Sequence, residues 1–206
     1  MKINKKTIQK VGLATLIMSG MLLIASAALA AESAVWTTLS VSGSLTENVT
    51  LNVDEELRFS DVSGPALARQ HTDLSLGVKV NDLFSVGAGY RNTSAGEHRP
   101  YVGVGLSLIR GDLSLDSTTK AELRDFDTVR ARTDLTLSTE VAGVTPWITD
   151  ELFIDSSGIT GNRASVGVTK GINNIYGVNA YYLMDTAGTD FANSAHVLGL
   201  GLSVSL

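Results

Sequence analysis

Apolar residues recur at every second position from Val35 to Leu206, the last residue of the chain. This spacing is typical of β-strands with one apolar face, and no extended window shows the spacing of an amphipathic helix. The pattern therefore predicts an all-β fold. The segments that carry it are residues 35–45, 51–59, 74–80, 84–90, 102–108, 113–123, 129–137, 144–155, 164–168, 176–184 and 198–206.

The connections between these segments alternate in length. Short links that suit hairpin turns lie at 81–82, 111–112, 142–143 and 173–174. Longer links lie at 62–70, 92–97, 156–161 and 185–195. Short turns at one end and longer loops at the other are characteristic of outer-membrane barrels. We therefore predict a single domain, an antiparallel up-and-down transmembrane β-barrel.

The number of strands is less clear than their type. The pattern gives eleven segments, whereas bacterial single-chain barrels have an even number of strands with both termini in the periplasm. Either the first segment does not span the membrane, or the eighth segment, interrupted by Pro146, contains a further crossing. The sequence therefore predicts 10 to 12 strands.

The first 30 residues have the character of an export signal. Four lysines and no acid precede a nearly uninterrupted apolar stretch over 11–30, which ends in Ala28-Leu29-Ala30. The pattern predicts a signal peptide at 1–30, cleaved after export by the general secretory route, and a barrel domain over 31–206. An uncleaved membrane helix is the alternative, because about 20 apolar residues can span a bilayer.

Charge and cysteine content exclude other classes. Without the four lysines of the first 30 residues, 12 basic residues face 21 acidic ones, which is a net charge of −9. We expect no nucleic-acid partner, because phosphate contacts need clustered Lys and Arg. The chain has no cysteine, which excludes disulfides, cysteine-ligated metals and the lipidated cysteine of a lipoprotein.

The two faces of the predicted strands differ in charge. Acids and bases mix on the polar face, often two positions apart, where they can pair along and across strands. The other face is almost free of charge, with Glu55 as the exception. Because Arg or Lys on a lipid-facing surface costs about 2 to 4 kcal/mol at the bilayer midplane, we predict that the apolar face contacts outer-membrane lipid. The alternative is a soluble periplasmic barrel that binds an apolar small ligand in an apolar interior.

In the membrane interpretation, the polar face lines a lumen. Its predicted charge network is Asp54, Glu56, Arg58, Arg91, Lys120, Glu122, Arg124, Arg130, Arg132, Asp134, Glu151 and Arg163. The arginines could line a pore or hold an anionic solute. Alternatively, the paired charges could form a plug of side chains. We favour the plug, because the lumen of a barrel with 10 to 12 strands is only modestly wider than one that side chains fill. Glycines 77, 87, 89, 103, 105, 167, 177, 199 and 201 share this parity. We expect them to leave room for the long charged side chains.

Several short clusters resemble the outer-membrane barrels grouped as domain-of-unknown-function family 2490. The clusters are Trp36, Glu56-Leu57-Arg58-Phe59, Gly89-Tyr90-Arg91, Glu97-His98-Arg99-Pro100, Glu122-Leu123-Arg124, Arg130 with Arg132, Glu151 with Phe153, and Asn162-Arg163. The resemblance covers essentially all of the chain after residue 30 and implies a single barrel of unassigned activity in a Gram-negative outer membrane. Lipid and the barrel-assembly machinery are then the expected partners. Two departures are the final Leu206, where assembly signals usually have an aromatic residue, and an aromatic content of only 6%.

Three histidines fall at the loop ends of their predicted strands. His71, His98 and His196 could ligate a metal if they met at one rim, but their segments need not be neighbours, and we favour three unrelated residues. A hydrolase would pair a histidine with a serine and a carboxylate, and Ser194 near His196 is the only close serine candidate. We therefore predict no enzyme activity, no metal and no cofactor, and the solute is left open.

Overall fold

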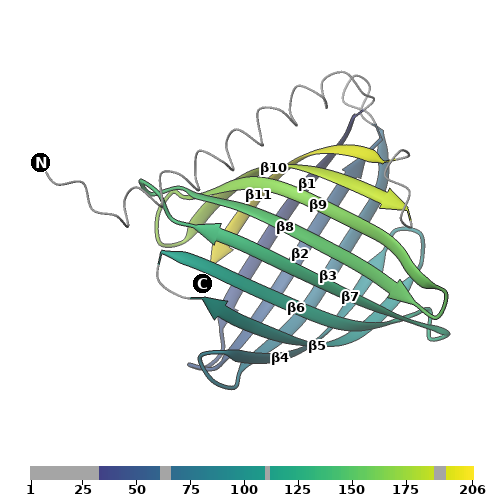
Figure 1. Ribbon diagram of the computed structural model, residues 1–206, viewed down its shortest axis with the longest axis horizontal. Helices are drawn as coiled ribbons and strands as arrows, with labels where there is room; N and C mark the ends of the chain where they lie inside the picture. Colours follow the sequence, from purple (N-terminus) through teal and green to yellow (C-terminus); the bar gives the residue numbers. More distant parts are fainter. Residues whose placement is uncertain (1–32, 61–65, 110–111, 188–193) are drawn as a thin grey trace, which may run out of the picture.

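The structure is a computed structural model that describes residues 33–60, 66–109, 112–187 and 194–206. Within these ranges eleven strands form one closed barrel (Figure 1). The predicted signal peptide at 1–30 lies outside the described residues. No helix of the described part is long and apolar enough to cross a membrane. The strands are β1 (Ser33–Ser44), β2 (Val49–Phe59), β3 (Leu67–Lys79), β4 (Phe84–Thr93), β5 (His98–Ile109), β6 (Leu113–Arg124), β7 (Thr128–Thr139), β8 (Thr145–Asp155), β9 (Gly158–Gly171), β10 (Tyr176–Ala187) and β11 (Ala195–Ser205).

The barrel closes through a parallel pair of strands. Strands that follow one another in the chain pair antiparallel, but β1 pairs parallel with β11, from Ser33 opposite His196 to Ser42 opposite Ser205. This corrects the prediction of a fully antiparallel barrel. With an odd number of alternating strands, the last strand runs in the same direction as the first, and only a parallel ladder can join them. The ends of the barrel sequence, at Ser33 and Leu206, consequently lie at opposite rims.

All eleven predicted segments form strands, so neither explanation offered for the odd count was correct. β1 pairs along most of its length with both β2 and β11. β8 is a single strand with Pro146 at its second residue, before the pairing with β7 begins at Trp147. The missing proline N–H therefore removes no bond between β7 and β8.

The two rims differ less than predicted. One rim carries the links 45–48, 80–83, 110–112, 140–144 and 172–175, and is called the turn rim; the other, called the loop rim, carries 60–66, 94–97, 125–127, 156–157 and 188–194. At the loop rim only 60–66 and 188–194 are longer than the turns opposite, whereas 156–157 has two residues. The expected long loops at 92–97 and 156–161 are shortened to 94–97 and 156–157, because polar residues continue the backbone ladder beyond the apolar alternation.

The two faces are placed as the membrane interpretation predicts. Leu76, Val104 and Leu200 face outward, with exposed fractions of 45%, 57% and 58%, whereas Glu122 is only 1% exposed. Glu55 is confirmed as an outward charge, and its carboxylate accepts hydrogen bonds from Gln70 and Thr72 across the β2–β3 pair. The apolar positions thus cover the outside, and the charges lie inside.

A second outward carboxylate was not foreseen. Asp150 alternates with Ile148 and Leu152 on β8, and its Oδ1 accepts a hydrogen bond of 2.7 Å from the amide of Asn162. The sequence obscured this position because β8 is apolar on both faces. Trp147 and Phe153 point into the lumen, opposite to the outward isoleucines.

Candidate functional site

The charged side chains of the lumen gather in the half nearer the loop rim, called the loop half. They come from the ends of β2, β4, β6, β8 and β10 and the beginnings of β3, β5, β7 and β9, where alternate residues point inward. We call this set the ion-pair belt. Its members are Glu56, Arg58, His71, Asp73, Arg91, Glu97, Arg99, Glu122, Arg124, Arg130, Arg132, Glu151, Arg163 and Asp185.

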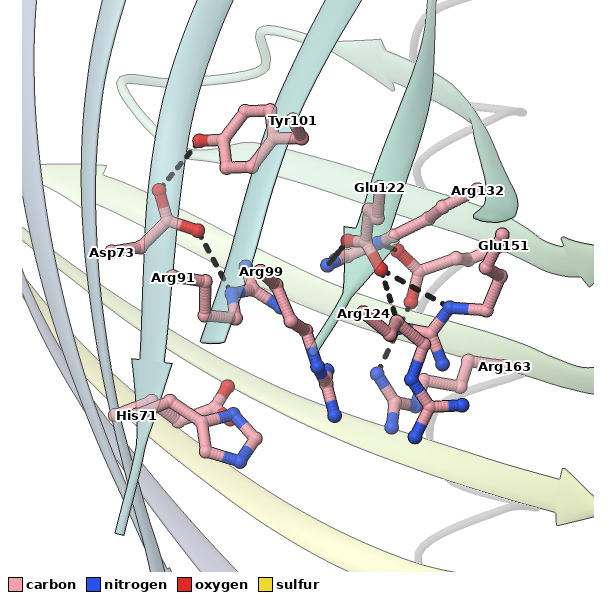
Figure 2. Close-up of polar contacts among 12 residues, drawn as sticks. His71, Asp73, Arg91, Arg99, Tyr101, Glu122, Arg124, Arg132, Glu151 and Arg163 are labelled. Atoms are coloured by element: carbon pink, nitrogen blue, oxygen red, sulfur yellow. Dashed lines mark hydrogen bonds and ion pairs between the residues drawn. The ribbon is translucent and has the colours of Figure 1, made fainter. Parts of the chain in front are cut away.

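Glu122 on β6, whose contacts are drawn in Figure 2, is the most buried member of the belt. Its Oε2 accepts hydrogen bonds from Nη2 and Nε of Arg130, at 2.5 and 3.1 Å. Its Oε1 lies 3.7 Å from Nη1 of Arg132. Both arginines are on β7, two positions apart, and Arg130 lies directly opposite Glu122 in the strand register. A carboxylate with its charge compensated from two sides can stay ionised away from water.

Glu151 on β8 extends the chain of ion pairs to the next strands. It accepts a hydrogen bond from Nε of Arg132, and its Oε2 lies 3.4 Å from Nη1 of Arg163 on β9. Nε of Arg163 lies 3.1 Å from Oδ2 of Asp185 on β10. Positive and negative groups therefore alternate without interruption from β6 to β10.

Three arginines occupy neighbouring strands β4, β5 and β6. Arg91 and Arg99 are directly opposite each other, an arrangement that is unfavourable for like charges. Two carboxylates compensate for it. Asp73 accepts hydrogen bonds from Nε of Arg91 at 2.8 Å and from the Tyr101 hydroxyl at 2.5 Å. The second carboxylate, Glu97, lies on the loop side of these strands.

Glu97 belongs to the link between β4 and β5 and joins two arginines. It accepts hydrogen bonds from Arg99 and, at 2.5 Å, from Nε of Arg124. The hydrogen bond from Arg99, together with that from Arg124, lowers the pKa of Glu97 to about 2, against the opposing effect of burial. Glu97 is therefore ionised at any physiological pH and ties the 94–97 link to β6.

The belt continues across the parallel seam through an aromatic ring. Nη2 of Arg58 lies 2.6 Å from Glu56, whose Oε1 is also 3.3 Å from Nδ1 of His71. The guanidinium of Arg58 lies 3.6 Å from the ring centre of Trp36 on β1, and that of Arg163 lies 5.3 Å from the same ring. Cations over an indole face are attracted by its electron density. β1 and β11 carry no Asp, Glu, Lys or Arg. Trp36 therefore links the charged side chains of β2 to those of β9 through its ring.

Phe153 has a similar role within the belt. The guanidinium groups of Arg130 and Arg163 each lie 4.8 Å from its ring centre, and that of Arg132 lies 5.7 Å away. Planar guanidinium groups that stack on an aromatic ring lose conformational freedom. The belt is thus held in place by ion pairs and by aromatic contacts.

Of the inward glycines, Gly103 lies against a charged side chain as predicted, since a Cβ there would meet Cγ of Lys120 at 3.1 Å, but three others make room for aromatic rings. A Cβ on Gly199 would lie 2.0 Å from the Tyr181 ring, and one on Gly167 would lie 2.3 Å from the Trp147 ring. A Cβ on Gly89 would likewise meet Tyr101 at 2.3 Å. Each ring lies flat over the glycine of a neighbouring strand, which keeps these rings against the wall of the barrel.

The half of the lumen nearer the turn rim, called the turn half, differs in its lining. Small residues line it, including Ser75, Ser85, Gly87, Gly105 and Thr118. A cavity of about 270 Å³ lies there between β3 and β6, and a cavity of about 420 Å³ lies in the loop half between β6 and β11. The ion-pair belt thus narrows one half of a lumen whose other half is lined by small residues.

The belt contains nine of the twelve residues of the predicted charge network. The other three also point inward: Asp54 alternates with Glu56, Nζ of Lys120 lies 4.8 Å from the Tyr101 ring, and Asp134 is opposite Glu151. The remaining belt members were not in the predicted network; they are His71, Asp73, Glu97, Arg99 and Asp185. Their strand parity could have identified Asp73 and Arg99, whereas Asp185 had been assigned to a loop.

The three histidines do not meet. His71 points inward to Glu56. His98 and His196 face outward, where Nδ1 of His98 lies 2.5 Å from the Tyr90 hydroxyl and His196 bonds to Tyr182. No group of three possible metal ligands occurs among the residues that the structure describes.

A closed barrel with an apolar outer wall and a polar lumen has the architecture of porins, and comparison with solved structures agrees. The NanC porin superposes with a TM-score of 0.56 at 13% sequence identity, over 81% of this chain and 91% of that chain. The KdgM porin gives a TM-score of 0.52 at 13% identity, over 71% and 81%. A second KdgM structure, "in complex with disordered oligogalacturonate", gives 0.53 at 13% identity, over 71% and 82%. At this identity the likeness establishes the fold.

The chain belongs to the protein family of unknown function DUF2490, whose model matches residues 33–193. The resemblance seen in the sequence is thereby confirmed. No curated protein matches the chain.

Proposed function

We propose that the protein is an outer-membrane channel of narrow bore for small hydrophilic solutes, with the ion-pair belt as its constriction. The observation that carries this proposal is the position of the belt, whose long, mutually bonded side chains extend into the loop half, while mainly short residues line the turn half. Side chains can nearly fill a small barrel. In this barrel the length of the inward side chains, more than the strand number, sets the bore.

The outer face supports a location in the outer membrane. Its exposed leucines and valines, such as Leu76 and Val104, would be unfavourable in water. A soluble barrel for an apolar ligand would need such residues inside, where this barrel has the ion-pair belt. We propose export to the outer membrane and insertion by the barrel-assembly machinery, in keeping with the porin-like fold.

The location is tested by fractionation of the expressed full chain. We expect the protein in membrane pellets after washing with alkaline carbonate, and a faster gel mobility for the unheated detergent-solubilised protein than for the boiled one. Recovery in osmotic-shock fluid without detergent would instead identify a soluble periplasmic barrel.

The belt is close to electroneutral, with seven arginines and six carboxylates. Because a strong electrostatic field in a channel needs an excess of charges of one sign, we expect this balanced set to discriminate only weakly between small ions. For the same reason we do not expect it to conduct long polyanions. The bore is tested by conductance in planar bilayers. We expect the native protein to carry a small current and the double variant Arg132→Ala/Glu151→Ala to carry one several-fold larger.

Removing both partners avoids leaving a buried charge unpaired. The matched control is Lys79→Ala/Asp82→Ala, which removes an exposed ion pair of 2.8 Å at the turn rim and should leave the current near the native value. A current unchanged in the belt variant, or zero in both variants and the native protein, would show that the belt is not the constriction of a channel.

A further inference from the structure

The cavity of about 420 Å³ in the loop half has the features of a ligand site. It is lined by side chains of both charges from β6 to β10 and opens toward the loop rim. The charged and aromatic residues that line it are Arg124, Arg130, Phe153, Asp155, Arg163 and Asp185. A concave site of a few hundred Å³ with a few convergent polar groups is of the size that binds small molecules.

Arg124 and Arg130 bring hydrogen-bond donors to this cavity. Arg124 bonds to Glu97 through Nε, and its side chain is 38% exposed. Arg130 uses Nε and Nη2 on one oxygen of Glu122. Because a guanidinium carries five N–H groups in a fixed plane, each arginine keeps further Nη donors for a ligand. These two donor groups need no rearrangement, since their carboxylate partners hold them.

The carboxylates at the cavity are already engaged. Asp185 is paired with Arg163, and Oδ1 of Asp155 accepts hydrogen bonds from the backbone N–H and hydroxyl of Ser157 at 2.8 and 2.6 Å. Arg124 and Arg130 are themselves compensated by Glu97 and Glu122, which are not part of the lining. The groups that these arginines still offer to the cavity are planar N–H donors, which favour a ligand with paired acceptor oxygens, such as a carboxylate, over a cation.

We propose that the cavity is a binding site for a small organic carboxylate, with the carboxylate of the ligand between Arg124 and Arg130. Planar guanidinium groups match the geometry of a carboxylate and can bind it with paired N–H bonds. Phe153 contributes by positioning, because its ring contacts the guanidiniums of both Arg130 and Arg163. The cavity would be the entrance site of the proposed channel, so this assignment rests on the proposed function. Ligand binding can nevertheless be measured without conduction.

The test is calorimetric titration of the detergent-solubilised full chain with sodium gluconate, and with glucose as the neutral analogue of similar size. We expect saturable binding of gluconate and none of glucose. Arg124→Gln should weaken gluconate binding by about tenfold, the effect of losing one charge-assisted hydrogen bond. The matched control is Arg69→Gln on β3, which removes an arginine outside the cavity lining and should leave the affinity unchanged.

Each other outcome overturns the assignment. Equal binding of gluconate and glucose, or equal loss in both arginine variants, would exclude recognition of the carboxylate by Arg124. Asp185→Asn should tighten gluconate binding about threefold by removing a nearby negative charge; weaker binding would show that this aspartate contacts the ligand. Gel mobility of the unboiled variants confirms that they fold. A current through the native protein without gluconate binding would refute the proposed binding site and support the proposed channel. Gluconate binding without a current would refute the channel and support the binding site.

Discussion

The two halves of the lumen have the same wall but opposite linings. In the loop half, long side chains pair across every strand interface from β6 to β10 and continue over Trp36 to β2 and β3. In the turn half, the inward positions of β3 to β6 are mainly glycine, serine and threonine. The same closed sheet forms the wall of both halves, so the difference lies mainly in side-chain length and charge.

This contrast shows how a small barrel can hold many ionised groups away from bulk water. Each buried carboxylate of the belt meets at least one guanidinium, as Glu122 and Glu151 do, because an unpaired charge in such a place would cost several kcal/mol. The turn half holds fewer charges. Many of its polar groups are hydroxyls that pair locally, such as Thr136 with Thr149 at 2.7 Å, and its carboxylate Asp116 accepts hydrogen bonds from the hydroxyls of Ser107 and Ser114.

We expect the largest difference in stability between the two halves when one charge is removed from the belt. Glu151→Gln would leave Arg132 and Arg163 without the carboxylate they share, and we expect a loss of about 3 to 5 kcal/mol in the free energy of unfolding. The control Lys79→Ala breaks an exposed pair at the turn rim and should cost about 0 to 1 kcal/mol. Urea unfolding in detergent or lipid measures both, and similar losses would mean that the belt is not the more constrained half.

A smaller difference is expected between two inward glycines. Gly199→Val would drive a side chain into the Tyr181 ring, whereas a Cβ on Gly77 has no heavy atom within 4 Å. We expect Gly199→Val to reduce the free energy of unfolding by about 1 to 3 kcal/mol and Gly77→Val to have an effect within about 0.5 kcal/mol. If the same urea titration gave equal effects, Tyr181 would not lie against the wall at Gly199.

The smallest expected effect concerns pH. The pKa of Glu97 is lowered from its usual 4.5 to about 2, so its ionised form stabilises the fold above pH 4.5, and this contribution is lost as pH falls through about 2. Glu97→Gln should lower the melting temperature at pH 7 by about 2 to 4 °C and lose less stability than the native protein between pH 4.5 and 2. Thermal unfolding followed by circular dichroism across this range measures it. Parallel pH curves for the two proteins would contradict the link between the pKa and the pairs with Arg99 and Arg124.

Much of the architecture could be read from the chain, because a β-strand sends alternate residues to opposite faces. Val104 and Arg132 were placed outside and inside by parity alone, and the structure agrees. The eleven segments were also found. The closure was not, because alternation says nothing about which strands join the ends of a sheet.

The errors have local physical causes. Asp150 was missed as an outward charge because Trp147 and Phe153 make the lumen face of β8 as apolar as the other. Asp185 was placed in a loop because the strand continues two residues beyond it on backbone hydrogen bonds, which polar residues support as well as apolar ones. Gly89, Gly167 and Gly199 were assigned to charged neighbours instead of aromatic ones, since ring contacts such as Gly199 with Tyr181 cross between strands.

By itself, the sequence determined that this chain forms strands with an apolar and a charged face, and that the charged face holds both signs. Those properties depend on the order of residues along each strand. The tertiary structure decided which charges meet, how the barrel closes through β1 and β11, and where the lumen narrows. The reason is that ion pairs such as Arg163 with Asp185 lie between strands, and their distances depend on register, curvature and closure, which no local pattern specifies.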